Sequence, residues 1–379
     1  MSGRIYLDYN ATSVVRPEAE AGMVAALRLG GNASSVHAAG RAARAMVEEA
    51  REAVAALAGA RPQDVVFTSG GSEANTLAIT SAVQAGSRRL IVGATEHASV
   101  LDTAAASGAA VELWPVDSNG VADLGWLADR LKHWTAADGR PFVAVMAANN
   151  ETGVIQPLGE IGVLVHDAGG WLHVDAVQAT GKIAIDAIPA DTIAISAHKI
   201  GGPQGSGALI VACDVELTRR AFGGGQERGR RGGTENLSGI AGFGAAARTV
   251  WASGVLDQGA WRDGAAARLK AEAGSVVLGE GAPRLSNTLC FATPGYSSDL
   301  QVIALDLAGV MVSAGAACSS GKVKSSHVVQ AMGRPDLGVC SLRVSGGWAT
   351  KAADWDRFVD AWLEAHARHA ARTRKLVEA

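Results

Sequence analysis

The stretch TIAISAHKIGGPQGSGALIV, residues 192–211, contains one cation, Lys199. An apolar run typical of a strand precedes Lys199, and Gly201, Gly202 and Pro203 follow it before a second apolar run. Burying an ammonium group is costly, and proteins tolerate that cost where the amine is itself a reagent, as in Schiff-base chemistry. A lysine at the end of a strand can also simply extend into solvent. The stretch therefore predicts a buried strand followed by a candidate reactive amine.

Length and composition are those of a globular protein. The chain has 379 residues, of which 48% are hydrophobic and 19% charged, enough for a large core and two domains. A net charge of −3 provides no basic field for nucleic acid or an anionic membrane, and no apolar run is long enough to span a bilayer. The N-terminal sequence lacks the layout of a signal peptide. We expect a cytoplasmic protein that binds neither nucleic acid nor membrane.

The four cysteines, Cys213, Cys290, Cys318 and Cys340, are scattered and never spaced as CxxC. This spacing disfavours a disulfide framework and a structural zinc site, and it suits a reducing compartment. One of the four can still be chemically active.

Six short apolar runs predict buried strands: 64–69, 89–95, 141–148, 170–176, 191–196 and 207–212. They are almost continuously apolar, which is typical of strands covered on both faces. Helical patterns separate many of them, most clearly at 40–60, where Arg44 and Glu48 are four residues apart. The alternation predicts an α/β domain with a mostly parallel sheet.

The pattern changes after about residue 250. A strand at 284–292, a helix at 299–308, a loop rich in Gly, Ala and Ser, and a final helix from 352 predict a smaller α+β domain. We place the large domain at 15–255 and the small domain at 1–14 and 256–379. A mobile loop at 313–328 carries Cys318.

Two motifs directly follow predicted strands. Gly70, Gly71 and Ser72 lead into a helix, where free amides and a hydroxyl suit an anion such as phosphate, although a well-capped helix would look the same. Asp175 and Gln178 follow another strand, and an Asp there can hold a protonated ring nitrogen. His173 and Asp175 could instead suggest a metal, but no third ligand is clustered with them, so we predict no metal site.

The remaining motifs each have a structural alternative. Asn149 and Asn150 offer amides or form a turn, and His97 after a strand is catalytic or structural. Residues 222–236 resemble an RGG segment, but a mobile Gly loop that brings Arg and Thr to an anion suits a net acidic protein at least as well.

Cys318 stands among small residues, with Lys322 and Lys324 nearby to favour a thiolate, or it is an ordinary half-buried cysteine. Arg343 interrupts an apolar strand and can grip a carboxylate or form a structural ion pair. Together with Lys199, Asp175 and the anion site, these residues form the set found in a pyridoxal-phosphate enzyme.

The chain resembles the cysteine desulfurases of the NifS/IscS type, in the class V aminotransferase-like group. The resemblance rests on ordered motifs along nearly the whole chain: YLDYNAT, FTSGGSEAN, TEHASVL, NNETGVIQP, HVDAVQATGK, SAHKIGGPQG, GGGQERGRRGGTEN and SAGAACSS. The motif GGGQERGRRGGTEN looks closer to the NifS branch of this family. The resemblance implies a fold-type I homodimer. Its large domain would have a mostly parallel seven-stranded sheet with helices on both faces, and its small domain would be α+β.

The resemblance also implies a role for each matching residue. Lys199 would bind the aldehyde of pyridoxal 5'-phosphate covalently and take the Cα proton of L-cysteine. Cys318 would attack the substrate sulfur and become a persulfide, and alanine would leave. The other implied cofactor contacts are His97 on the ring, Asp175 at its nitrogen, Gln178 at its phenolic oxygen, and Gly71, Ser72, Ser196 and His198 at the phosphate. Asn150 and Arg343 would bind the substrate carboxylate, and Thr234 would reach the phosphate in the partner subunit.

The sulfur would pass to an iron–sulfur scaffold or another acceptor protein. Two departures affect this expectation: GNASSVHAAGR lacks the Asn-Pro often seen there in the family, and the chain ends soon after its last helix, which puts docking of an IscU-like scaffold in doubt. The closest alternatives are a selenocysteine lyase, a cysteine-sulfinate desulfinase or an aminotransferase on the same scaffold. A non-enzymatic sulfur carrier is a further alternative.

Overall fold

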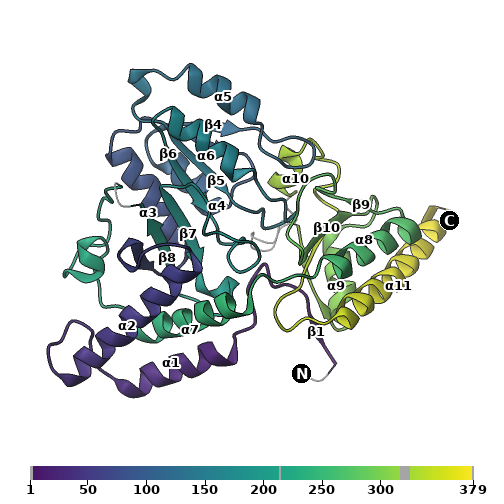
Figure 1. The fold of residues 1–379 in the computed structure, drawn as a ribbon. Helices are drawn as coiled ribbons and strands as arrows, with labels where there is room; N and C mark the ends of the chain where they lie inside the picture. The colour runs from purple at the N-terminus through teal and green to yellow at the C-terminus, as the bar shows by residue number, and fades with distance from the viewer. Residues whose placement is uncertain (1–2, 213–214, 316–324, 378–379) are drawn as a thin grey trace.

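A computed structural model describes residues 3–212, 215–315 and 325–377, and a seven-stranded sheet forms its centre (Figure 1). The strands lie in the order β2-β8-β7-β6-β5-β3-β4, and β8 alone runs antiparallel to its neighbours. Their bounds are β2 Val65–Thr68, β3 Arg89–Gly93, β4 Ala110–Trp114, β5 Phe142–Met146, β6 Trp171–Asp175, β7 Thr192–Ser196 and β8 Gly207–Val211. The predicted mostly parallel α/β fold is confirmed, and all six predicted strands belong to this sheet.

The seventh strand, β4, was not among the runs found in the sequence. It is an edge strand that pairs only with β3 in the described part of the chain, and three of its five residues are exposed. Leu113 is 58% exposed. A strand with so little burial lacks the continuous apolar run by which the other six were found.

Helices cover both faces of this sheet. Successive strand residues point to opposite faces, so Val65 and Phe67 pack in one core cluster with α2, α5, α6 and α7, whereas Val66 packs with α3 in another. The helices are α1 Pro17–Leu29, α2 Ala38–Leu57, α3 Gly71–Gln84, α4 Ala98–Ala106, α5 Leu124–Lys132, α6 Leu158–Asp167 and α7 Leu237–Ser253. Short 3-10 turns lie at η1 Pro62–Asp64, η2 Ala136–Asp138, η3 Ala197–Lys199 and η4 Gln226–Gly229.

A second, antiparallel sheet forms the smaller α+β part of the molecule. Its strand order is β12-β13-β10-β9, and a parallel pair, β1 and β11, lies beside it. The elements are β1 Ile5–Tyr6, α8 Gly259–Ala273, β9 Val276–Val277, β10 Thr288–Ala292, α9 Ser298–Leu307, β11 Val310–Met311, β12 Ser313–Ala314, α10 His327–Ala331, β13 Ser341–Ser345 and α11 Ala352–Val377. Both ends of the predicted loop 313–328 are therefore regular, in β12 and α10. The predicted domain boundaries stay a prediction.

The described helices include none that is both long and apolar enough to cross a lipid bilayer.

A buried ion pair fixes the Gly-rich segment 222–236 against the sheet. The Arg51 guanidinium on α2 donates to both carboxylate oxygens of Glu227, at 2.8 and 2.9 Å, and Glu227 also accepts the backbone N–H of Phe67 at 2.9 Å. Both side chains are 3% exposed. Glu227 and Arg228 hold positive φ angles of 48° and 56°, so this anchor maintains a strained backbone. Residues 222–236, which the sequence analysis interpreted as a mobile Gly loop, are thus anchored to β2.

Glu227→Gln should lower the free energy of unfolding by about 3 kcal/mol, because it removes the buried carboxylate that pairs with both Nη atoms of Arg51 and leaves only the half-exposed Glu48 as an ion-pair partner. Urea unfolding followed by tryptophan fluorescence measures the change. Glu272→Gln is the matched control, since Glu272 pairs with Arg268 at the surface, where such a pair contributes less than about 1 kcal/mol. Equal effects of the two changes would contradict the anchoring role.

Candidate active site

One cavity of about 290 Å³ opens at the carboxyl ends of the parallel strands, where the second sheet approaches the first. It brings together most of the residues predicted from the sequence. Its lining includes Gly71, Ser72, His97, Asn150, Asp175, Gln178, Ser196, His198, Lys199 and Arg343. The lining residues between Gly71 and Lys199 lie in the segments that follow β2, β3, β5, β6 and β7, as expected for an open α/β sheet.

Lys199 ends the short turn η3, directly after β7. Its Nζ donates to the backbone oxygens of Asn10, at 2.5 Å, and Ala11, at 2.9 Å. The residue is half-buried rather than fully buried. The amine is thus held at the cavity wall by neutral acceptors.

The N-terminus of α3 forms an anion cradle. Gly71 begins this 14-residue helix, and Ser72 follows at the cavity wall beside Ser196. A Cβ on Gly71 would lie 2.6 Å from Val177 Cγ2, so the close approach of the two turns requires glycine. Burial, and then the charge of Lys199, lowers the pKa of His198 to about 4, so its ring is neutral. Backbone N–H groups, hydroxyls and the helix dipole together suit a phosphate.

Asn75 links the acidic and imidazole groups of the site. Its Nδ2 donates to Asp175 Oδ2 at 2.8 Å and to Ser99 Oγ at 2.9 Å, and its Oδ1 contacts His173 Nε2 at 3.0 Å. Ser99 Oγ in turn lies 2.8 Å from His97 Nδ1. Asp175, Ser99, His97 and His173 are therefore held by one amide.

His173 does not face the cavity as a metal ligand would. Its Nδ1 contacts Thr192 Oγ1 at 3.0 Å and its Nε2 contacts Asn75, so both ring nitrogens are occupied. Complete burial lowers the pKa of His173 to about 3, which keeps the ring neutral. His173 is a structural residue that orients Asn75.

His97 caps α4 and lines the cavity. Burial lowers its pKa; the carboxylate of Asp175 opposes this shift, and the charge of Lys199 adds to it. At neutral pH the imidazole is thus unprotonated and can accept a proton inside the cavity.

Arg343 is positioned for both of the roles considered for it, the structural ion pair and the binding of a carboxylate. Its Nη2 pairs with Asp8 Oδ1 at 2.7 Å, and its Nη1 donates to the Asn150 backbone oxygen at 3.1 Å. Its buried Nε has no hydrogen-bond partner among the described residues. The guanidinium thus forms a structural ion pair in a residue that also lines the cavity.

The two neighbouring asparagines separate into one structural and one cavity-lining residue. Asn149 Oδ1 accepts the backbone N–H groups of Glu151 and Thr152, each at 2.9 Å, so it forms the turn. Asn150 lines the cavity. The carboxylate of Glu151 lies behind this turn and accepts a hydrogen bond from Ser326 Oγ at 2.5 Å.

One predicted residue stands apart from the cavity. Thr234 lines a separate pocket with Glu227 and Arg231. Cys318 lies outside the described residues. Cys290 and Cys340, which are described, are buried, and burial raises the pKa of each thiol. Neither of them suits a nucleophile.

Comparison with known proteins places the chain in a family. The sequence matches the aminotransferase class-V family over residues 5–358. The chain belongs to the class-V aminotransferases. It is 41% identical to a cysteine desulfurase of Cereibacter sphaeroides over 94% of both chains, and 36% identical to an IscS-like cysteine desulfurase of Mycobacterium tuberculosis over 98% of this chain and 97% of the other.

Solved structures agree with the fold. A NifS-like protein from Rickettsia africae superposes with a TM-score of 0.86 at 30% identity, covering 96% of this chain and 99% of that one. A structure described as SspA in complex with cysteine has a TM-score of 0.76 at 28% identity, covering 90% and 98% of the two chains. The resemblance to NifS/IscS-type proteins and the fold-type I architecture are confirmed.

Pyridoxal phosphate is the cofactor of these class-V enzymes, and the donor set of the cavity fits it. Gly71, Ser72, Ser196 and His198 would hold its phosphate, because they form the anion cradle at the start of α3. Asp175 is 6% exposed and also lines the cavity, and its carboxylate would hold a protonated ring nitrogen. Lys199 supplies the amine.

Three residues of this class-V site were missed in the sequence: Asn10, Asn75 and Lys182. Asn75 lies four residues after Gly71 in α3, so helical spacing put it on the same face as the cradle. Lys182 lies four residues after Gln178. Asn10 gave no local signal, because it joins the site from the other end of the chain.

Burial makes Glu151 a source of pH dependence. Burial raises its pKa from 4.5 to about 7, against the hydrogen bond from Ser326 and the charge of Arg343. The native state therefore retains a proton that the unfolded chain releases. This contribution is complete below pH 4.5 and is lost as the pH rises through 7, with a total of roughly 3 kcal/mol at 1.36 kcal/mol per unit.

Glu151→Gln removes that titration, so the variant should gain stability relative to wild type between pH 5 and pH 8 by up to about 3 kcal/mol. Urea unfolding at both pH values measures it. Glu160→Gln, on the exposed surface of α6, is the control and should show no such change. Parallel pH curves for wild type and Glu151→Gln would disprove the assignment.

Proposed function

We propose that the protein is a pyridoxal-phosphate-dependent cysteine desulfurase, which converts L-cysteine to L-alanine and leaves the sulfur as a persulfide on Cys318. One observation carries the proposal: a single cavity holds the amine of Lys199, the carboxylate of Asp175 and the anion cradle at α3. The cysteine in SAGAACSS distinguishes this reaction from aminotransfer, which needs no thiol. The relatives named cysteine desulfurase support it.

Each residue has a task that its surroundings support. Pyridoxal phosphate, when bound, supplies the electron sink for cleavage at the substrate's α and β carbons. Lys199 would bind its aldehyde and move the Cα proton. Asp175 would keep the ring nitrogen protonated, and His97 would lie against the ring and accept a proton. Gln178 would donate to the ring oxygen.

Arg343 and Asn150 bind the carboxylate of L-cysteine. The position of both residues in the cavity lining supports this task, and the ion pair with Asp8 keeps the Arg343 guanidinium oriented. Because Arg343 is also paired with Asp8, it should bind the substrate carboxylate more weakly than an unpaired arginine would.

The sulfur transfer balances without an added oxidant. The Cys318 thiolate attacks the substrate Sγ, the Cβ–Sγ bond breaks, and its electron pair stays with the carbon fragment, which takes up a proton and leaves as L-alanine. The products are L-alanine and Cys318 persulfide. The terminal sulfur then passes to a thiol of an acceptor, either an iron–sulfur scaffold or another protein.

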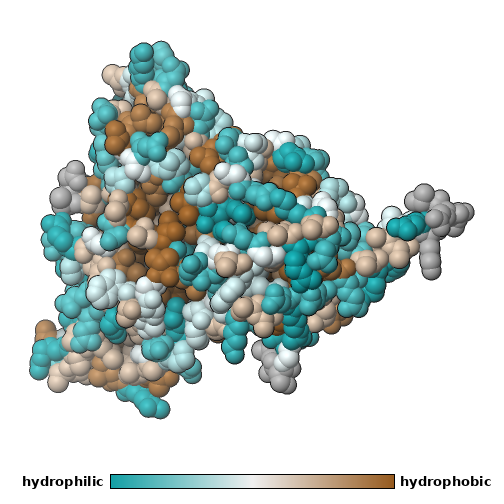
Figure 2. Space-filling model, turned by 45° about the vertical axis from the view of Figure 1, so that its right-hand side comes forward, coloured by the Kyte–Doolittle hydropathy of each residue, from teal (hydrophilic) through white to brown (hydrophobic). Residues whose placement is uncertain are grey.

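The active form is a homodimer in the cytoplasm. Thr234 lies outside the cavity of its own chain, which supports its proposed role at the cofactor phosphate of the partner subunit. On the face that Figure 2 shows, hydrophobic residues gather mainly over the part with the seven-stranded sheet. Exposed apolar side chains such as Phe222, 81% exposed, and Trp251, 65% exposed, belong to that part and suit a subunit interface.

Cys318→Ala should abolish sulfide release from L-cysteine while leaving the visible absorbance of the bound cofactor intact. In the wild type, mass analysis after incubation with L-cysteine should find one added sulfur atom on the peptide that bears Cys318. Cys340→Ala is the matched control, because its thiol is buried and protonated, and it should retain the added sulfur on Cys318. Sulfide release that survives Cys318→Ala would overturn the proposal.

A selenocysteine lyase is the second candidate, since it uses the same cavity. Selenide release from L-selenocysteine that survives Cys318→Ala, with no turnover of L-cysteine by the wild type, would favour it. Borohydride reduction locates the cofactor in either case: the adduct belongs on Lys199, and its absence there would exclude both functions.

A further inference from the structure

Lys182 is a buried amine of the site that the proposed reaction does not use. It follows the turn after β6, is 7% exposed, and lies next to the cavity that holds Lys199. Its Nζ donates to Asn10 Oδ1 at 2.8 Å and to Gln178 Oε1 at 2.9 Å. Both acceptors are neutral, and no carboxylate lies within ion-pair distance of Lys182 among the described residues.

This contact settles which way the Gln178 amide points. An ammonium has donors only, so it holds the amide oxygen and turns the NH₂ group away. Gln178 Nε2 accordingly donates to the Asn10 backbone oxygen at 2.8 Å. Nε2 carries a second N–H, and Gln178 lines the cavity. With its oxygen held by Lys182, Gln178 can offer the cavity a donor but not an acceptor.

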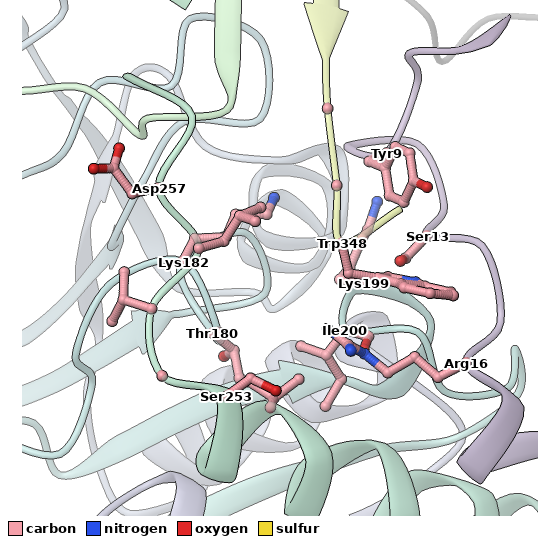
Figure 3. A pocket seen from close by; sticks show the side chains of 17 residues that line it. Tyr9, Ser13, Arg16, Thr180, Lys182, Lys199, Ile200, Ser253, Asp257 and Trp348 are labelled. Carbon is pink, nitrogen blue, oxygen red and sulfur yellow. The ribbon is translucent and has the colours of Figure 1, made fainter. Parts of the chain in front are cut away.

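Among the described residues, the charges that act on Lys182 are those of the cations Lys199 and Arg343. Burial, and then those charges, lowers the pKa of Lys182 well below its ordinary value. Lys182 and Lys199 also line a second cavity of about 290 Å³, with Arg16 and Trp348. In Figure 3 the two lysines come from opposite walls of that cavity. The one acidic residue of its lining, Asp257, forms no ion pair with Lys182.

We infer that Lys182 is a positioning residue for the cofactor: it orients the Gln178 amide so that an N–H faces the ring oxygen, and the anionic form of that oxygen would favour the protonated amine, which is then its counter-charge. The inference rests on the proposed function, because it requires pyridoxal phosphate in the cavity. It explains why a lysine without a carboxylate partner is buried at this position. A neutral residue could orient the amide but could not balance the oxygen's charge.

Removing the charge should change the titration of the bound cofactor. In Lys182→Met, which keeps the length of the side chain, the pH midpoint of the visible absorbance change should rise by about one unit, because the lost cation no longer opposes a bound proton. Lys182→Arg should restore the wild-type midpoint. Lys351→Gln, which removes an exposed lysine, should leave it unchanged.

A second pair of variants tests the route through Gln178. If Lys182 acts through that amide, the shifts of Gln178→Ala and Lys182→Met should not add in the double variant. In Lys182→Met, kcat should fall about tenfold, whereas KM for L-cysteine should change less than about twofold, since Lys182 does not touch the carboxylate site. Lys182→Gln replaces Lys182→Met if the latter does not fold.

Different results would overturn the proposed function and the role of Lys182. A wild-type protein that takes up no cofactor on Lys199 would overturn the proposed function. A wild type that binds and titrates normally, with the same midpoint in a folded, loaded Lys182→Met, would overturn only the role of Lys182. An equal shift in Lys182→Arg and Lys182→Met would do the same, because the charge would then not matter.

Discussion

The site depends on the hydrogen bonds of one residue, Asn10, which joins the two sheets. Its backbone oxygen accepts from Lys199 and Gln178, its Oδ1 accepts from Lys182, and its N–H donates to Ser345 Oγ at the end of β13. Asn10 is 1% exposed, so these bonds form where water cannot replace them. The N-terminal segment thereby fixes the reactive amine against a sheet built from the other end of the chain.

The sequence predicted the central sheet well, because its signal is local. Strands such as β5 and β7 are buried on both faces and appear as continuous apolar runs. The edge strand β4 has no such run, since one flank and much of its surface meet solvent. The anchoring of the Gly-rich segment by Arg51 also escaped prediction, because Arg51 and Glu227 are 176 residues apart. Nothing in either local pattern indicates the other.

The residues of the site also divide into those that local sequence signals predicted and those that they did not. Asp175, Gln178 and Lys199 follow strands, so the rule that ligands bind at the carboxyl ends of parallel strands is enough to bring them together. The roles of Asn10 and Lys182 could be recognised only from the structure, because they consist of contacts with each other and with Gln178. Arg343 shows a further limit: two alternatives, ion pair and carboxylate ligand, were kept apart in the sequence, yet its planar guanidinium has enough donors for both.

The charges around the cavity explain why such a site is arranged this way. Lys199 and Arg343 line it, and Lys182 contacts the lining residues Asn10 and Gln178. Asp175 is held by Asn75, and Asp8 by Arg343. Cations buried in excess destabilise a protein unless an anion joins them. Pyridoxal phosphate brings a phosphate and a ring oxygen, so its binding offsets a cost already present in the folded chain. Because the same groups orient the cofactor and repel one another without it, occupancy of the site and stability of the fold are coupled through these charges.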